Sequence, residues 1–200
     1  MHVSTHFAIG VIFGVIFSQI YPMATTWWSF GIIVLGAIIA DSDYIFSKFA
    51  PDHNHRMLPT HSIYFPLLLL IIGVLIPNPL VVTVALAYLS HPLIDLLDWG
   101  TNCFLTGKIV GPRILLDKTE YLIVPQLMHQ EKYPKWFFVK RYYHSKIVLG
   151  LEILVFISMV MGIWLLTPQY WYFLFGYFFV LGLHLYEYFT LQKLTRTHTS

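Results

Sequence analysis

Charged side chains are scarce in this sequence. Lys and Arg number 12 and Asp and Glu number 10, so 11% of the 200 residues are charged, against about 25% in an average soluble domain. Hydrophobic residues make up 57% of the chain, and the mean hydropathy is +0.67. This composition disfavours a soluble enzyme, a nucleic-acid-binding module and a disordered chain.

Cysteine is nearly absent as well. The single cysteine, Cys103, cannot form an internal disulfide, so no disulfide framework supports the fold. The lack of thiols also excludes an iron–sulfur cluster. The ten histidines are unusual by contrast, because ionisable side chains are rare in membrane proteins unless they have a function.

The charges leave three long gaps, at residues 1–40, 57–94 and 153–186. A membrane-spanning helix needs about 20 apolar residues, so each gap has room for two short spans. Proline-containing turns near 21–26, 77–79 and 167–169 divide the gaps. We therefore predict an all-α polytopic membrane protein, one membrane domain over 1–200. Its six helices form three hairpins, at about 4–20, 27–41, 62–76, 80–97, 147–166 and 170–189, the first four short enough to be tilted or partly re-entrant. The alternative, a buried all-α soluble core, would need exposed polar faces that this pattern lacks.

The positive charges predict the orientation. All Lys and Arg lie within 41–56, 95–152 and 187–196, outside the three turns. The positive-inside rule therefore places these windows and both termini in the cytoplasm, and the protein in the inner (cytoplasmic) membrane. The loop at about 98–145 is then a cytoplasmic subdomain between the fourth and fifth helices. Its residues 132–144 mix cations and aromatic rings, as is typical of the lipid headgroup zone.

Histidines and carboxylates gather at the cytoplasmic ends of the predicted helices. Five of the six helices supply one there, and none of the three turns does. His91 and Asp95 are four residues apart, so they share one face of the fourth helix. Such a pair can simply be satisfied by a hydrogen bond between its two side chains. The other histidines and carboxylates at the same depth favour a metal site instead. Imidazole and carboxylate ligands together suit Zn²⁺, Mn²⁺ or Fe²⁺.

Four short motifs in order resemble a known family. They are Thr5-His6-x-x-x-Gly10, Asp41-Ser-Asp43, His55-Arg56 followed by Thr60-His61-Ser62, and His91-x-x-x-Asp95 with Gly100. Over roughly residues 1–100 the chain resembles the YdjM-like membrane-bound metal-dependent hydrolases, a family of inner-membrane proteins.

The chain departs from the family pattern, and the pattern itself has a wider resemblance. The family usually shows Pro-Asp-x-Asp-His, whereas Ala40 and Tyr44 flank the aspartates here; His53 or His55 would have to replace that histidine as a ligand. The family's motif layout is in turn similar to that of zinc-dependent phospholipases C and single-strand nucleases, which implies phosphoester hydrolysis by analogy.

The hypothesis from sequence is a hydrolase that cleaves a lipid or lipid-linked phosphoester at the cytoplasmic membrane interface with a metal-activated water. We expect one to three divalent ions, Zn²⁺ before Mn²⁺ or Fe²⁺. Arg56 is the expected phosphate clamp, Asp43 a candidate general base, and Asp98 a residue that orients His91. The predicted metal ligands are His6, Asp41, Asp43, His61, His91 and Asp95, with His55, His184 and Glu187 as weaker candidates.

Two other functions stay open at this point. One is a haem-binding electron carrier with His91 and His184 as axial ligands. The other is a metal or proton transporter, although such proteins need ionisable groups near the midplane. Membrane lipid is the expected partner, nucleic acid is not, and the oligomeric state is not predicted. We expect His2 to be solvated, and Gly10 and Gly14 to permit close helix packing.

Overall fold

The computed structural model describes residues 2–121, 123–124, 126–127, 131 and 133–196. Within those residues the fold is all-α, and its β-structure is an isolated bridge between Thr101 and Val110. The α-helices are α1 (Val3–Ile20), α2 (Trp27–Ile38), α3 (Tyr64–Leu75), α4 (Pro79–Asp98), α6 (Pro134–His144), α7 (Lys146–Leu166) and α8 (Phe173–Arg196). Short 3₁₀ segments join them: η1 (Pro22–Ala24), η2 (Ile39–Phe49), η3 (Pro51–His53), η4 (His55–Met57), η5 (Pro59–His61) and η6 (Pro168–Tyr170).

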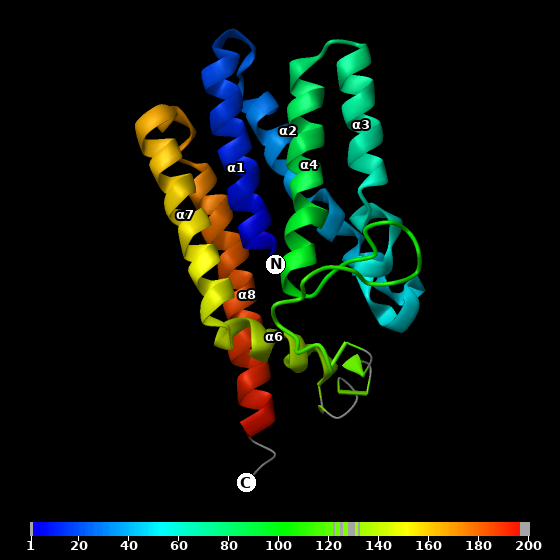
Figure 1. The fold of residues 1–200 in the computed structure, drawn as a ribbon. Helices are drawn as coiled ribbons and strands as arrows, with labels where there is room; N and C mark the ends of the chain where they lie inside the picture. The colour runs from blue at the N-terminus through cyan, green and yellow to red at the C-terminus, as the bar shows by residue number, and fades with distance from the viewer. Residues whose placement is uncertain (1, 122, 125, 128–130, 132, 197–200) are drawn as a thin grey trace.

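The three predicted hairpins are α1–α2, α3–α4 and α7–α8, and their turns lie at one end of the bundle (Figure 1). Local caps explain two of these turns. The Thr26 hydroxyl accepts from the Ser29 amide at the start of α2, and the Asn78 side chain accepts from Leu80 and Val81 at the start of α4. We call the end of the bundle that holds the three hairpin turns the turn end. The opposite end, where η2–η5 and α6 lie, is called the charged end.

Five helical segments in the described part of the chain are long and apolar enough to cross a membrane. They are Val3–Ile20, Trp27–Phe49, Pro79–Asp98, Lys146–Leu166 and Phe173–Arg196. The predicted span at 62–76 is shorter than expected, because α3 has 12 residues. At 1.5 Å per residue it is about 18 Å long, against about 30 Å of hydrocarbon. Of the six predicted helices, five are thus long enough to cross a membrane, and α3, one of the four expected to be short, is a short apolar helix.

Helix α1 lies at the centre and packs against α2, α4, α7 and α8. Its glycines permit the closest approach. A Cβ at Gly10 would lie 2.9 Å from both the Ala37 Cβ and the Val34 Cα, and one at Gly14 would lie 2.8 Å from the Phe30 ring. The expectation that these two glycines allow close packing is confirmed.

The outer faces of the helices are apolar. Large side chains remain exposed along α7 and α8, including Leu165 at 71% and Phe179 at 68%. Exposed apolar surface on this scale is unfavourable in water but favourable in lipid. The fold is therefore that of an all-α polytopic membrane protein.

Candidate metal centre

The histidines and aspartates of the predicted site lie toward the charged end, where α1 begins, α2 and α4 end, and η2–η5 pass beneath α3 (Figure 1). His6 comes from α1, Asp41 from η2, His61 from η5, and His91 and Asp95 from α4. All five belong to groups of side chains whose ligand atoms lie within 4.8 Å of one another, and His55 of η4 joins them. We call these six residues the ligand cluster.

Each of the two central histidines is fixed through one ring nitrogen. His91 Nδ1 lies 2.7 Å from the Ala37 carbonyl oxygen, so Nδ1 carries the proton and donates it there. His61 Nδ1 lies 3.2 Å from Asp43 Oδ2. Both Nε2 atoms are buried and have no hydrogen-bond partner among the described residues. A ring tied through one nitrogen, with the other nitrogen directed to a shared point, is typical of a metal-bound histidine.

The two Nε2 atoms meet two carboxylates. His91 Nε2 lies 3.5 Å from Asp41 Oδ1 and 3.6 Å from Asp95 Oδ2, and His61 Nε2 lies 3.7 Å from each of the same two oxygens. Hydrogen bonds between such atoms are usually about 2.7–3.2 Å long. Ligands around a tetrahedral zinc ion are about 3.4 Å apart, since zinc–ligand bonds are about 2.0–2.2 Å. The spacing fits four ligands of one ion better than a self-satisfied hydrogen-bond network.

His6 and His55 flank this centre. The His6 ring stacks on His91 with centroids 3.7 Å apart, and its Nε2 lies 3.2 Å from Asp95 Oδ1. On the other side, His55 Nε2 lies 3.7 Å from Asp41 Oδ1. Of the two histidines weighed for the family position, His55 is therefore the one beside an aspartate of the cluster.

Asp43 supports His61 rather than lying among the six clustered ligands. Its Oδ2 also accepts from the Thr60 hydroxyl, and the Thr60 carbonyl accepts from the Tyr88 hydroxyl at 2.8 Å. Burial disfavours a charged imidazole at His61, but the neighbouring carboxylates of Asp41 and Asp43 outweigh it and raise the pKa of His61 to about 9. The carboxylates around His61 therefore create a strong preference for positive charge.

Arg56, expected from sequence to be a phosphate clamp, contacts two carboxylates in this structure. Its Nη1 and Nη2 bind the two oxygens of Asp98 at 2.7 and 3.1 Å, and Nη2 lies 3.2 Å from Asp95 Oδ1. Burial would lower the pKa of Arg56, but Asp95 and Asp98 raise it above its usual value. The fork that would hold a phosphate is thus engaged by carboxylates. Asp98, which was expected to orient His91, binds Arg56 in this structure. The group that orients His91 is the Ala37 carbonyl.

The segment after α4 holds η4 and η5 in place. The Thr101 hydroxyl donates to the Arg56 carbonyl at 3.1 Å, and the Ile63 amide donates to the Cys103 carbonyl at 3.1 Å. Gly100 permits this approach with a φ of +78°, where a Cβ would lie 2.5 Å from the Val110 carbonyl oxygen. The chain therefore returns to the cluster through contacts that local sequence does not reveal.

His184 and Glu187 of α8 are not part of the ligand groups found among the described residues. Glu187 forms an ion pair with Lys135 of α6, and the His184 ring stacks on His2 with centroids 4.3 Å apart. His91, which the haem alternative would pair with His184, belongs to the ligand cluster instead. His2, which was expected to be solvated, is half-buried, and its Nε2 has no contact with solvent.

Sequence reasoning also missed Glu152 of α7, which is 8% exposed. Its Oε1 accepts from Ser4 at 2.9 Å and its Oε2 from Tyr142 at 3.2 Å. Glu152 borders the third charge gap, and this carboxylate next to an apolar run was the available signal. It connects the start of α1 to α6 and α7, beside His2.

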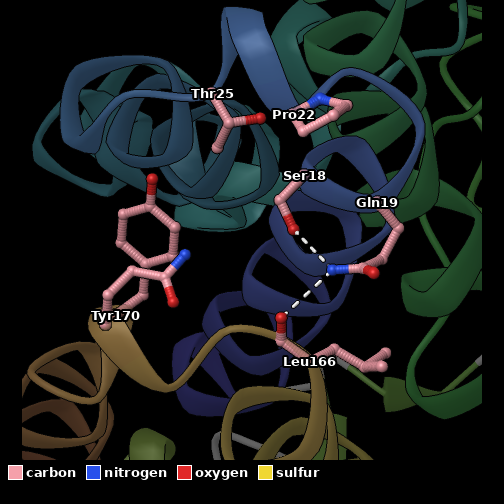
Figure 2. A pocket seen from close by; sticks show the side chains of 7 residues that line it. Ser18, Gln19, Pro22, Thr25, Leu166 and Tyr170 are labelled. Atoms are coloured by element: carbon pink, nitrogen blue, oxygen red, sulfur yellow. Dashed lines mark hydrogen bonds between the residues drawn. The ribbon is translucent and has the colours of Figure 1, made fainter.

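A polar recess with a volume of 330 Å³ lies at the turn end, away from the ligand cluster (Figure 2). Gln19 spans it by donating to the Ser18 hydroxyl at 3.3 Å and to the Leu166 carbonyl at 3.1 Å. No His, Asp, Glu or Cys is among its lining residues, which are Ser18, Gln19, Pro22, Thr25, Leu166, Gln169 and Tyr170. This recess therefore lacks metal-ligating side chains.

The fold and the ligand cluster together define a polytopic helical membrane protein with His and Asp residues placed to hold a metal ion. The family model described as YdjM inner membrane protein matches residues 1–105. The chain belongs to this family, and the match includes the whole ligand cluster. Comparison with curated proteins and with solved structures gave no match.

Proposed function

We propose that this protein is a metal-dependent hydrolase that cleaves a phosphoester of a lipid or lipid-linked substrate at the membrane interface. The observation that carries the proposal is the convergence of two otherwise unpartnered imidazole nitrogens with two carboxylates at 3.5–3.7 Å. Such a donor set suits Zn²⁺, with Mn²⁺ and Fe²⁺ as alternatives. The resemblance of the family motifs to zinc-dependent phospholipases supports the reaction class by analogy.

The residues of the ligand cluster would have different roles in this reaction. His61, His91, Asp41 and Asp95 would hold the ion, and His6 and His55 stand where a further ligand or ion would be held. A divalent ion supplies water of lowered pKa and stabilises negative charge on phosphate oxygens. Arg56 keeps Asp95 and Asp98 in position through its buried contacts.

Asp43 fits the role of proton acceptor. Its Oδ2 is occupied by His61 and Thr60, whereas Oδ1 has no hydrogen-bond partner among the described residues. In the proposed reaction, water adds to phosphorus and its proton passes to Asp43 Oδ1. The P–O bond to the leaving alcohol breaks, and that oxygen takes a proton from solvent.

The positive-inside rule favours a cytoplasmic site. All Lys and Arg of the sequence fall outside the three hairpin turns, and the ligand cluster lies at the end opposite those turns (Figure 1). If that end faces the cytoplasm, substrate would reach the cluster from the inner leaflet.

The first test is the metal content of the purified full-length protein. Wild type should carry a divalent metal, and His91→Ala and Asp95→Ala should lose most of it. Gln169→Ala, in the recess at the turn end, should retain it. Equal metal content in all four proteins would contradict the metal centre.

The second test concerns the reaction. Phospholipid vesicles and soluble phosphodiesters should be offered to wild type with and without a chelator. Chelator-sensitive release of a phosphorylated product is expected, and His91→Ala should abolish it. Turnover that persists without metal, or no turnover of any phosphoester by metal-loaded protein, would reject the hydrolase.

A further inference from the structure

A cluster of aromatic and imidazole rings, most of them half-buried, lies beside the metal centre and is not used by it. The His2 ring stands at its middle, 3.7 Å from the Tyr142 ring, 5.2 Å from Tyr143 and 4.3 Å from His184, by centroids. The His6 amide contacts the His2 carbonyl at 3.4 Å. His2 is thus one helical turn from a member of the ligand cluster.

Three polar atoms of this ring cluster are buried without a hydrogen-bond partner among the described residues: His2 Nε2, Tyr143 Oη and His184 Nε2. A buried polar group without a partner costs about 1–3 kcal/mol, so three in one place call for an explanation. Burial lowers the pKa of His2 and raises that of the Tyr143 phenol. A neutral imidazole and a phenol each have one proton to donate, which suits a phosphate oxygen.

An apolar groove of 280 Å³ lies between α7 and α8 and meets the ring cluster at Tyr143, which lines it. The one carboxylate in the groove lining is Glu152, whose two oxygens accept from Ser4 and Tyr142. The other lining residues include Phe156, Tyr177, Leu181 and Leu185. Both helices are long and apolar enough to cross the membrane, so a lipid chain is the apolar occupant within reach.

We propose that the α7–α8 groove holds an acyl chain of a membrane phospholipid whose phosphate is bound by His2, Tyr143 and His184. This inference rests on the proposed function in one respect, since it identifies the bound phospholipid as the substrate. The phosphate would then lie about one turn of α1 from His6, a member of the ligand cluster. The lipid binds whether or not it is cleaved.

Binding is tested without turnover, using the full-length protein treated with chelator in detergent micelles. The probe is phosphatidylglycerol with a diazirine at the end of one acyl chain, and unlabelled phosphatidylglycerol is the competitor. Labelling should saturate, be displaced by the competitor, and map to α7 and α8 at the groove. Unsaturable labelling spread over all outward faces would overturn the proposal.

The groove is tested with a matched pair of substitutions on α8. Leu181→Trp fills the groove and should reduce labelling about tenfold, whereas Leu183→Trp, at a residue 54% exposed, should leave it unchanged. If Leu181→Trp is not recovered folded, as judged by circular dichroism and thermal melting, Leu181→Phe takes its place. Equal labelling of the position-181 and position-183 variants would overturn the groove.

The phosphate contact is tested with a second probe, a diacylglycerol that carries the same diazirine chain but no phosphate. Tyr143→Phe and His184→Ala should each weaken phosphatidylglycerol binding about tenfold, as expected for a lost hydrogen bond to a charged group. Neither should affect diacylglycerol, and Tyr186→Phe, at a residue 74% exposed, should affect neither probe. Phosphatidylglycerol binding that is unchanged in both variants would overturn the assignment.

The outcomes separate this inference from the proposed hydrolase. Saturable binding that depends on Leu181 and Tyr143, without hydrolysis of any phosphoester, would support the lipid site and reject the hydrolase. Hydrolysis of phospholipid that is unchanged in Leu181→Trp, with unchanged labelling, would reject the lipid site and leave the hydrolase standing.

Discussion

The two ends of the helical bundle both hold polar side chains, but with different chemistry. At the turn end, the exposed Gln19 amide donates to one hydroxyl and one backbone carbonyl across the recess (Figure 2). At the charged end, His61 and His91 each use one nitrogen and leave the other directed at carboxylates. A neutral amide finds its partners in the nearest turns, whereas buried charges need counter-charges from several elements.

The comparison indicates where function lies. The polar side chains of the turn end stabilise a helix connection and have no spare ligand atoms of the metal-binding kind. The charged end concentrates histidines and aspartates far beyond what packing requires, and such groups persist in membrane proteins chiefly where they have a function. Each prediction below contrasts a change at the charged end with a matched change elsewhere.

The largest effect is expected for Arg56→Gln. This change removes the cation that faces Asp95 and Asp98 in the buried interior, and breaking such a pair costs about 3–5 kcal/mol. Arg141→Gln is the control, since the Arg141 side chain is 32% exposed in its pair with Glu120, and its loss should cost less than about 1 kcal/mol. Thermal and denaturant unfolding in detergent measures both. Similar costs would show that burial does not distinguish the two pairs.

Asp43→Asn should weaken metal binding about 10–100-fold, the usual effect of losing a group that orients a ligand. The amide retains the size of the side chain but removes the charge that holds His61 Nδ1 at 3.2 Å. Ser42→Ala is the neighbouring control, because the exposed Ser42 hydroxyl donates to the Ile39 carbonyl of its own segment. Isothermal titration with Zn²⁺ gives both affinities, and an Asp43→Asn affinity equal to wild type would exclude Asp43 from the centre.

Gly10→Val should destabilise the contact between α1 and α2 by about 1–3 kcal/mol, the usual cost of overpacking. The added Cβ would lie 2.9 Å from the Val34 Cα, a backbone atom that cannot move aside easily. Gly31→Ala is the control on α2, because a Cβ there meets nothing within 4 Å. Thermal melting compares the two, and a melting temperature unchanged by Gly10→Val would contradict the close packing of α1.

The smallest effect concerns acid. The hydrogen bond with Arg141 lowers the pKa of Glu120 from 4.5 to about 2. A lowered pKa contributes stability that is present above the unfolded value and is lost as pH falls from about 4.5 towards 2. The 99–133 segment should therefore be cleaved faster by protease as the pH falls over this range in wild type. The effect should be small, because the exposed ion pair contributes less than about 1 kcal/mol to stability. Glu120→Gln should be cleaved at a rate that varies less with pH over the same interval.

Much of the fold could be predicted because its signals are local. Four of the five long segments start within about a residue of their predicted positions, at Val3, Trp27, Pro79 and Lys146, and α8 starts three residues late at Phe173. The length of an apolar run and its prolines decide where a span begins. Helix α3 (Tyr64–Leu75) begins two residues after the predicted 62. Its segment is as apolar as the others, but the residues before it form the 3₁₀ turn η5, and the Ile63 amide binds the Cys103 carbonyl.

The candidate site could be predicted in part for the same reason. The His91–Asp95 pair follows from the helical period alone, and the structure places His91 Nε2 3.6 Å from Asp95 Oδ2. The partner of Arg56 could not be foreseen, because Asp98 lies 42 residues further along the chain. Glu152 was missed because its partner Ser4 is 148 residues away.

The sequence by itself determined that this protein is a helical membrane protein, and that its histidines and aspartates gather at one end of its helices. Both follow from where charges are absent, because lipid excludes charge over a fixed length of helix. Only the tertiary structure decided which carboxylate meets which imidazole, that Arg56 binds Asp98, and that His2 packs beside Tyr143 and His184. Those pairings depend on helices that meet across the bundle, and the distances that decide them are set by packing rather than by spacing along the chain.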